Sequence, residues 1–416
     1  MKGKLIFMIE QNKITLFNLR KSSTKDVKVF IENEFKKSVH TVDLSENAIK
    51  ACTGCWSCWL KTPGMCVFND PMAQSYPHYV NSEMIVIAID TAQGFINHVA
   101  KAFFDRSIVH FHPYIELVSN ECHHVARYQR YPKMVFYYDY NSLTSTQNKI
   151  IEDYLFRVAF HFKSEPYRII KNDNFKIERL EPRKASNKKS GFDQTSPMDK
   201  LIIYNGSPRV SKSNSQIILN EVEIKLKDKV EIRDLKNRAM FDVWANQFDK
   251  EEHVMFFMPL YVHAMPSHVM EFIEKLKPSK GDISFFVQSG FPESSQSHYL
   301  EAYFEELSVL LNRKYLGTCI KGGMEGLQQR PENMQLKMIQ PLVDAIEHVV
   351  NVGHFHSQQV DSLAKPVVFS KTTQVLFNLV GKKMMNYFWD SQLKQNNALS
   401  NSFDQPYVVS DNSSDS

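Results

Sequence analysis

The sequence lacks the features that mark membrane-spanning and nucleic-acid-binding proteins. Its 416 residues carry 50 lysines and arginines against 46 aspartates and glutamates, a formal charge of +4. That charge is too weak to indicate nucleic-acid binding, and no basic run alternates with aromatic residues. No stretch approaches the ~20 apolar residues of a membrane span. Residues 10–13, EQNK, interrupt the N-terminal apolar runs that a secretory signal would need. We therefore expect no nucleic-acid partner, no membrane span and a cytoplasmic location.

Cysteine is scarce, yet four of the 6 cysteines fall within residues 52–66, CTGCWSCWLKTPGMC. In a reducing compartment, clustered cysteines indicate a metal or redox site more often than structural disulfides. The spacing of Cys52, Cys55, Cys58 and Cys66 would let their thiolates surround a 4Fe–4S cluster or a zinc ion. Thiols that are redox-active without a metal, or simply buried, remain the alternative.

Strand-like and helix-like patterns alternate along the chain, and they do so twice. Continuous apolar runs such as 84–90, MIVIAID, and 253–259, HVMFFMP, are typical of strands buried on both faces of a parallel sheet. Amphipathic stretches separate such runs over ~150 residues in each half. A polar, Lys/Ser-rich stretch lies between the halves and indicates a linker. The pattern predicts an α/β protein with two doubly wound domains at 1–180 and 199–355, a linker at 181–198, and a C-terminal helical extension with a disordered tail at 356–416.

The loop at 206–215, GSPRVSKSNS, follows the first strand of the second domain, where a doubly wound domain binds phosphate. It has neither the Gly-Lys-Ser/Thr of a Walker loop nor a GxGxxG fingerprint, so a nicotinamide dinucleotide is not its natural ligand. Gly206 allows close backbone approach, and Arg209 offers a fork of donors suited to phosphate. The first N–H groups of the following helix complete an anion site. A serine-rich loop that only caps the helix is the alternative.

Two later loops lie at the same edge of the expected sheet. They are MPLYVHAMP at 258–266 and VQSGFPE at 287–293. Backbone amides in these loops, with Tyr261 and Phe291 as flat partners, could hold a planar heteroaromatic ring. Two ring-binding loops and one phosphate loop together describe a site for flavin mononucleotide (FMN).

The second domain resembles the NAD(P)H-dependent FMN reductases of the flavodoxin-like group. The resemblance rests on NGSPR…SNS at 205–215, PLYVHAMPSHV at 259–269, QSGFPE at 288–293 and GGMEG at 322–326. It implies a flavodoxin-like fold, non-covalent FMN, two-electron transfer from NAD(P)H, and dimers with the flavin near the subunit interface. The phosphate would be held by Ser207, Arg209, Ser213, Asn214 and Ser215, and the isoalloxazine bordered by Pro259, Leu260, Tyr261, Val262, Ser289, Gly290 and Phe291. No side chain is assigned as an acid–base catalyst, because the cofactor carries the hydride chemistry.

The cysteine segment resembles that of iron–sulfur flavoproteins and related flavodoxin-like reductases. In those proteins C-x-G-C-x-x-C, then G-x-C and an acidic pair, precede the third strand; here Asn69 replaces one acid and Asp70 keeps the other. The first domain's own phosphate loop, 18–26, has no glycine, and the acidic Asp90 lies where a ring clamp would be. We expect this domain to have lost, or nearly lost, its own flavin and to cover the second as an intramolecular pseudo-dimer, with a homo-oligomer as the alternative. The resemblance thus implies two flavodoxin-like domains in tandem.

Two further segments carry expectations. Residues 121–132, ECHHVARYQRYP, are expected to form a surface loop in which Arg127, Tyr128 and Arg130 meet the other half or an anionic substrate. Adjacent His123 and His124 would point to opposite faces of a strand, so they are not expected to share a metal. The amphipathic stretch at 374–398 could bind a membrane surface, but docking on the protein body is favoured.

These patterns together predict an NAD(P)H-dependent FMN oxidoreductase. Its acceptor would be a quinone, a nitroaromatic, a free flavin or a redox protein, and the cysteine segment is a candidate 4Fe–4S site. The alternative is a non-enzymatic redox sensor or electron-transfer flavoprotein.

Overall fold

A computed structural model describes residues 13–45, 49–171, 174–183 and 196–408. The expectations for the N-terminal residues 1–12, for most of the linker and for the terminal DNSSDS lie outside these residues.

The first half is built on a six-stranded sheet with the order β10-β9-β8-β3-β1-β2. Only the β9–β10 pair is antiparallel, and the parallel strands, numbered along the chain, run 2-1-3-4-5. This is the strand order of flavodoxin-like folds. Its strands are β1 (Lys13–Asn18), β2 (Val39–Asp43), β3 (Ser82–Ala88), β8 (Lys133–Tyr137), β9 (Pro166–Lys171) and β10 (Phe175–Arg179). Its main helices are α1 (Lys25–Phe35), α3 (Pro71–Val80), α4 (His98–Ser107) and α5 (Ser145–His161).

The second half repeats this order in a fully parallel sheet, β12-β11-β13-β14-β15. The central strands β13 and β14 are buried along nearly their whole length, because helices flank the sheet, and this explains their unbroken apolar runs. The strands are β11 (Leu201–Asn205), β12 (Val230–Asp234), β13 (His253–Pro259), β14 (Asp282–Gln288) and β15 (Lys314–Lys321). The helices are α6 (Asn214–Leu226), α7 (Phe241–Gln247), α8 (Ser267–Ile273), α9 (Ser295–Leu310) and α10 (Glu332–Val352).

The expectation of a surface loop at 121–132 is wrong. This segment begins as β7 (Glu121–Ala126), which pairs antiparallel with β6 (Phe111–Val118). Arg127 is only 2% exposed, and its guanidinium donates to the backbone oxygens of Ser402 at 3.0 Å and Asp404 at 2.9 Å. A buried arginine is tolerated because carbonyls from the C-terminal segment accept its protons.

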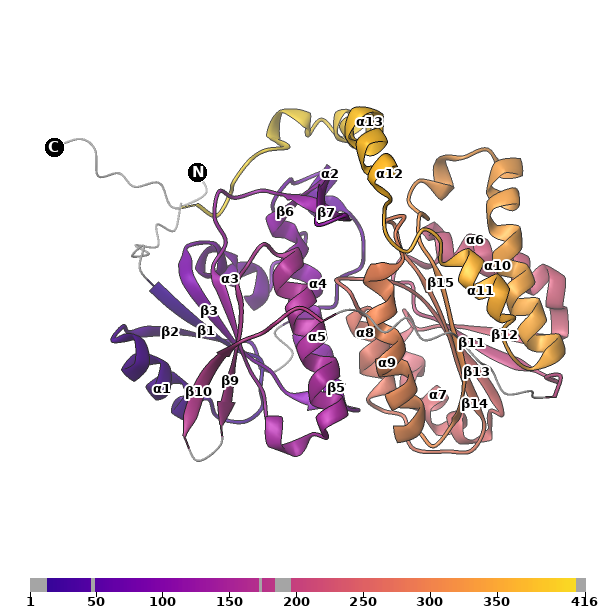
Figure 1. Cartoon of the computed structure of the whole chain (residues 1–416), viewed down its shortest axis with the longest axis horizontal. Helices are drawn as coiled ribbons and strands as arrows, with labels where there is room; N and C mark the ends of the chain where they lie inside the picture. The colour runs from indigo at the N-terminus through magenta and orange to yellow at the C-terminus, as the bar shows by residue number, and fades with distance from the viewer. Residues whose placement is uncertain (1–12, 46–48, 172–173, 184–195, 409–416) are drawn as a thin grey trace.

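The C-terminal segment leaves the second half at α11 (Ser357–Leu363) and passes back over the first half (Figure 1). It continues through α12 (Lys371–Leu376), a π-helical turn (Phe377–Gly381) and α13 (Lys382–Gln395). α13 packs against β6 and against the short helix α2 (Ser57–Leu60) of the cysteine segment. Trp389 on α13 is 3% exposed and meets Trp56 and Trp59 edge-on. No helix in the described part of the chain is long and apolar enough to span a bilayer.

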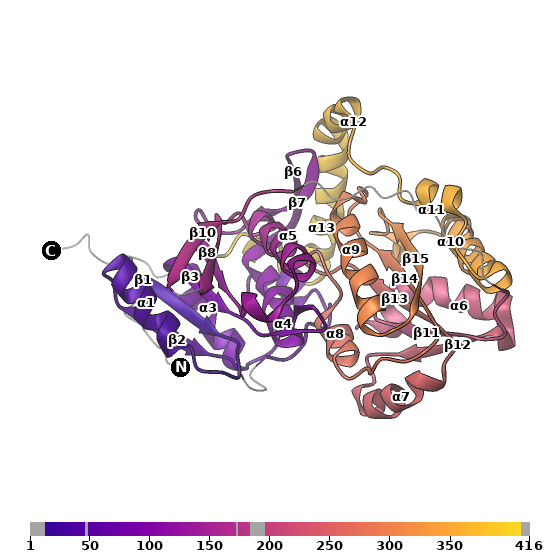
Figure 2. The same ribbon diagram turned by 60° about the horizontal axis from the view of Figure 1, so that its bottom comes forward.

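The two halves meet through equivalent helices. α4 and α8 each follow the third parallel strand of their sheet, and α5 and α9 each follow the fourth. α4 packs against α8 and α5 against α9, side by side in both views (Figures 1 and 2). One hydrophobic core cluster takes residues from both halves. Equivalent helices of the two halves therefore face each other across this seam.

An ion pair between Lys101 and Asp105 of α4 is buried in this seam, with both side chains at most 1% exposed. Backbone groups of the other half form hydrogen bonds with both members of the pair. Lys101 Nζ donates to the carbonyl of Tyr261 at 2.8 Å, and Asp105 Oδ2 accepts from the backbone N–H of Ser267 at 2.9 Å. Buried charges persist only when paired and hydrogen-bonded, so the pair ties α4 to the loop after β13.

We therefore expect Lys101→Met to lower the free energy of unfolding by about 3–5 kcal/mol, because it leaves the Asp105 carboxylate buried without its cation. Chemical denaturation followed by circular dichroism measures this change. Lys275→Met is the matched control, since Lys275 pairs with Asp242 at the surface, where such pairs contribute only about 0–1 kcal/mol. Equal losses from the two substitutions would contradict the role given to the buried pair.

Candidate functional site

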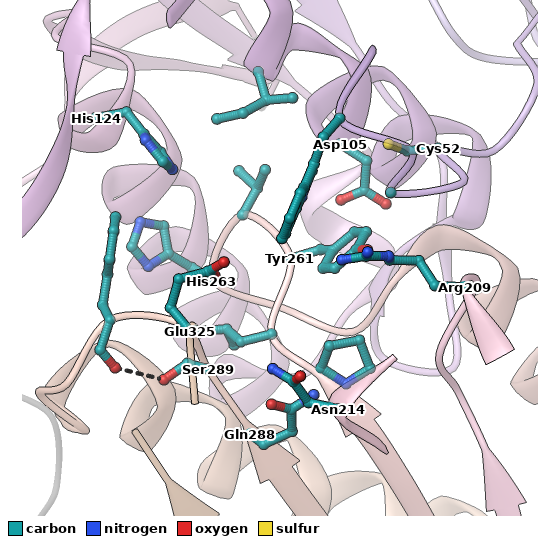
Figure 3. A pocket seen from close by; sticks show the side chains of 18 of the residues that line it. Cys52, Asp105, His124, Arg209, Asn214, Tyr261, His263, Gln288, Ser289 and Glu325 are labelled. Carbon is teal, nitrogen blue, oxygen red and sulfur yellow. Dashed lines mark hydrogen bonds between the residues drawn. The ribbon is translucent and has the colours of Figure 1, made fainter. Parts of the chain in front are cut away.

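A cavity of about 230 Å³, counted as space open to the centres of water molecules, lies between the halves (Figure 3). One water needs about 10–15 Å³ on this measure, so the cavity has room for a ligand. It lies beyond the carboxyl ends of β11, β13 and β14. The strand order reverses between β11 and β13, which is where doubly wound sheets bind ligands.

The structure places eleven of the twelve predicted cofactor-binding residues on the wall of this cavity. They are Ser207, Arg209, Ser213, Asn214, Pro259, Leu260, Tyr261, Val262, Ser289, Gly290 and Phe291. The exception is Ser215, which is fully buried and whose Oγ accepts a hydrogen bond from Gln288 Nε2 at 3.2 Å. Ser215 therefore supports the wall without reaching the cavity.

Two of the predicted phosphate ligands already have protein partners for their side chains. Ser213 caps α6, accepting from the N–H of Gln216 at 3.1 Å and donating to the carbonyl of Val210 at 2.6 Å. The Asn214 amide donates to the carbonyl of Met324 at 2.6 Å. Among the residues that the structure describes, the donors left for an anion are the Ser207 hydroxyl, the Arg209 guanidinium and the backbone N–H groups that open α6.

In the loops that border the predicted ring site, some backbone N–H groups likewise already donate hydrogen bonds to the protein. The N–H groups of Leu260, Tyr261 and Ser289 bond to backbone carbonyls at 2.8–2.9 Å. Within the described part of the chain, the N–H groups of Val262, Gly290 and Phe291 have no protein acceptor. These three are therefore the amides that a bound ring could use, a narrower set than the sequence suggested.

The cysteine segment of the first half forms one wall of the cavity. Gly54 has φ +61°, and a Cβ there would lie 2.1 Å from Tyr261 Oη, so only glycine lets the segment close on Tyr261. The Arg209 guanidinium stacks over the Trp56 ring, 4.1 Å from its centroid. Both contacts cross between the halves, so the second half alone does not complete this cavity.

Sequence reasoning missed several lining side chains, namely Asp105, His124, His161, His263, Glu325 and Trp389. The sequence signals were weak: a His-His pair at 123–124 and the short GGMEG motif around Glu325. Glu325 is half-buried and lies beside Gly290, where a Cβ would come within 2.7 Å of its Oε2. Burial raises the pKa of Glu325 to about 7, although the charge of Arg209 opposes the shift.

A second, smaller cavity of about 50 Å³ is lined by all four clustered cysteines. All six cysteines of the chain are free thiols. Burial raises the pKa of Cys52 to about 12 and lifts that of Cys58 well above its usual value. Arg106 Nη2 donates to Cys66 Sγ at 3.6 Å. In the described ranges, no three Cys, His, Asp or Glu side chains are grouped so that they could hold a metal ion. This arrangement therefore supports neither the 4Fe–4S cluster nor the zinc ion that the sequence suggested.

The first half has a loop after β1 that corresponds to the phosphate loop of the second half. In the first half, the donors of this loop are taken by the Asp90 carboxylate. Asp90 accepts from the backbone N–H of Lys21 at 2.9 Å and from Arg20 Nε at 3.1 Å. These are donors that a phosphate would need after β1.

Neither protein-family models nor curated proteins gave a match to this chain. Solved structures did. An NADPH-quinone reductase from P. pentosaceus is 14% identical, with a TM-score of 0.29 over 35% of this chain and 96% of its own. General stress protein 14 of Treponema denticola, in complex with FMN, is 16% identical over 35% and 99%, with a TM-score of 0.28. An FMN-dependent NADH-azoreductase from Bacillus anthracis, also with FMN, is 14% identical over 37% and 100%, with a TM-score of 0.30.

Glu325 should make stability pH-dependent. Its raised pKa means that the folded protein holds a proton that the unfolded chain releases, so stability falls as pH rises from 4.5 towards 7. Glu325→Gln keeps the neutral form, and we expect it to stabilise the flavin-free protein by up to about 3 kcal/mol at pH 8 but little at pH 4.5. Urea denaturation at both pH values measures this. Glu252→Gln, on a largely exposed side chain, is the control, and a pH-independent effect of Glu325→Gln would refute the assignment.

Proposed function

We propose that this protein is an NAD(P)H-dependent FMN oxidoreductase whose flavin occupies the cavity between the halves. The observation that carries the proposal is the cavity's position and polarity. It lies at the switch point of the second sheet. Within the described residues, donors without a protein acceptor lie at one end, and flat side chains lie next to backbone amides that also lack one. Phosphate and isoalloxazine need this combination, and the residues present fit it.

Each set of side chains has a defined task in this proposal. Ser207, Arg209 and the start of α6 bind the phosphate, while the amides of Val262, Gly290 and Phe291 hydrogen-bond the ring system. Tyr261, kept in place by Lys101 and Gly54, borders the ring. When bound, FMN accepts two electrons from NAD(P)H and passes them on. The chain's own residues bind and orient the cofactor and exclude water.

The proposal includes an intramolecular pseudo-dimer. Equivalent helices pair across the seam, as in a two-fold dimer, and the first half supplies a wall to the second half's site. Because Asp90 takes the donors of the first half's phosphate loop, we assign one flavin to each chain. Equilibrium dialysis should therefore give one FMN per chain, and two would contradict this part.

The deciding experiment adds FMN to the purified chain and measures oxidation of NADH and NADPH with ferricyanide, an acceptor that needs no binding site. Steady turnover supports the oxidoreductase. Bound flavin without turnover would favour an electron-transfer flavoprotein or redox sensor, and failure to bind flavin would refute the proposal.

We expect Arg209→Met to weaken FMN binding about 10- to 100-fold, because it removes a charged donor from the phosphate. Fluorescence titration measures this affinity. Riboflavin, which lacks the phosphate, should bind the variant as well as it binds the original chain. Arg238→Met is the control, since Arg238 pairs with Glu271 at the surface. An equal loss of affinity for FMN and for riboflavin would show that Arg209 affects folding or binding of the ring system and not the phosphate.

We further propose that the four-cysteine cavity holds a 4Fe–4S cluster. A zinc ion needs its sulfurs about 2.3 Å from one point, whereas a cluster holds four thiolates around a larger body. The support for a cluster is that all four cysteines line one cavity. Arg106 at Cys66 and Arg127 near Cys58 would offset the negative charge of the thiolates. Cys52 and Gly54 line both cavities, so a cluster would be adjacent to the flavin site.

Protein purified without oxygen should then contain about four irons and four sulfides per chain. Cys58→Ala should lose most of this iron, whereas Cys319→Ala, a buried thiol of the second half's core, should keep it. Iron and sulfide analysis measures both. Absence of iron from the original chain would leave only thiol chemistry in this segment, without affecting the flavin proposal.

A further inference from the structure

The C-terminal helical segment docks on the protein body with one face. Trp389 and Leu393 of α13 are buried in a cluster with Trp59 and Tyr114 of the first half. Phe377 of the π-helical turn is buried in another cluster, with side chains of β6 and β7. These contacts account for one face of the segment between α12 and α13.

Large apolar side chains form another face, which is exposed. Of the 18 exposed large apolar side chains in the described part of the chain, six lie between residues 375 and 387, and each is 56–74% exposed. They are Val375, Leu376, Leu379, Val380, Met384 and Tyr387. Spacings of three and four residues place them along one side of the helical segment. Single exposed apolar residues need no explanation, but a continuous row of them marks a binding surface.

The same segment is strongly basic. Between Asp361 and Asp390 the sequence has four lysines and no other charged residue, a formal charge of 4 − 0 = +4, which equals that of the whole chain. Asp390 accepts a hydrogen bond from the Tyr114 hydroxyl at 2.6 Å, so its carboxylate is directed towards the body. All four lysines are exposed, and within the described residues none of them forms an ion pair; they are Lys365, Lys371, Lys382 and Lys383.

An anionic lipid bilayer matches both the apolar row and the charge. Apolar side chains of such a helix enter the boundary between headgroups and acyl chains, while lysine ammonium groups stay at the anionic headgroups. A second copy of this chain fits less well, because a two-fold contact would place the same basic surface against itself. α12 projects beyond the rest of the molecule at the top of Figure 2, so a flat surface can reach it.

We propose that residues 371–387 are a docking surface for an anionic lipid bilayer. The segment lies in the plane of the membrane surface, with the row from Val375 to Tyr387 inserted, and it does not span the bilayer. Trp389 of the same helix lines the main cavity, so docking would hold that cavity close to the membrane. The proposal does not depend on the flavin or on turnover.

Flotation of the purified full chain with lipid vesicles tests the proposal. One set of vesicles contains phosphatidylcholine alone, and the other contains phosphatidylcholine mixed with anionic phosphatidylglycerol. We expect the chain to float with the mixed vesicles only. Binding should weaken between 0.1 M and 1 M salt, because the Debye length falls from about 10 Å to about 3 Å.

The contribution of the apolar row is tested by Leu376→Gln combined with Leu379→Gln. This variant should bind mixed vesicles at least about tenfold more weakly, because two apolar side chains no longer leave water. Ile224→Gln combined with Val309→Gln is the matched control, since these side chains are equally exposed but lie on α6 and α9. Circular dichroism should show the same fold for both variants, because all four positions are exposed.

The contribution of charge is tested by Lys382→Gln combined with Lys383→Gln. Each lysine near an anionic surface strengthens binding about fivefold, so this variant should bind about 10- to 30-fold more weakly at low salt. Its binding should also depend less on salt. Lys277→Gln combined with Lys280→Gln is the control, because both lysines are exposed outside the docking surface, and it should bind like the original chain.

Failure of the original chain to bind mixed vesicles, or equal binding to both kinds of vesicle, would overturn the proposal. Unchanged binding by either docking-surface variant would also overturn it. If the leucine variant loses self-association in analytical ultracentrifugation while its vesicle binding is unchanged, the row belongs to a contact between two copies. FMN affinity should be the same for all variants, so the flavin proposal and this one can fail separately.

Discussion

The buried Lys101–Asp105 pair is the constraint on which the site depends. Its two charges lie in the first half, but their remaining hydrogen-bonding capacity is met by Tyr261 and Ser267 of the second. Separating the halves would leave both charges without those partners in an apolar surface, which is strongly unfavourable. The loop after β13 is therefore held in one position by the other half. The geometry of the cavity follows from the seam as much as from the sheet that carries it.

The cavity has two ends of different character. At the Arg209 end, a fixed cation and free N–H groups suit an anion, and the raised pKa of Glu325 limits competing negative charge near neutral pH. At the other end, burial keeps the imidazoles of His161 and His263 neutral, so they offer hydrogen bonds without net charge. Electrostatics would thus favour a negatively charged group at the Arg209 end and an uncharged ligand at the histidine end.

The sequence was most informative where local pattern determines structure. The apolar runs of β13 and β14 predict these two strands. The rule that ligands bind at the carboxyl edge of a parallel sheet predicts that the loops after β11, β13 and β14 line the cavity. The remaining features depend on contacts between distant segments. Nothing near Arg127 in the sequence shows that carbonyls some 275 residues later accept its protons. No sequence motif links His161 to His263, so their meeting at the cavity could not be predicted. The sequence also does not show whether the Ser213 hydroxyl binds a ligand or caps α6, as it does in the structure.

The like-to-like packing of α4 on α8 and α5 on α9 also has a genetic consequence. In a dimer of identical subunits every substitution occurs twice, so neither copy of a site can change without the other. Here each helix of a pair is encoded separately. One half can therefore have its phosphate loop occupied by Asp90, or carry clustered cysteines, while the other half keeps an open cavity. Two halves joined in one chain are therefore not bound by that symmetry, and single mutations can change one half without the other.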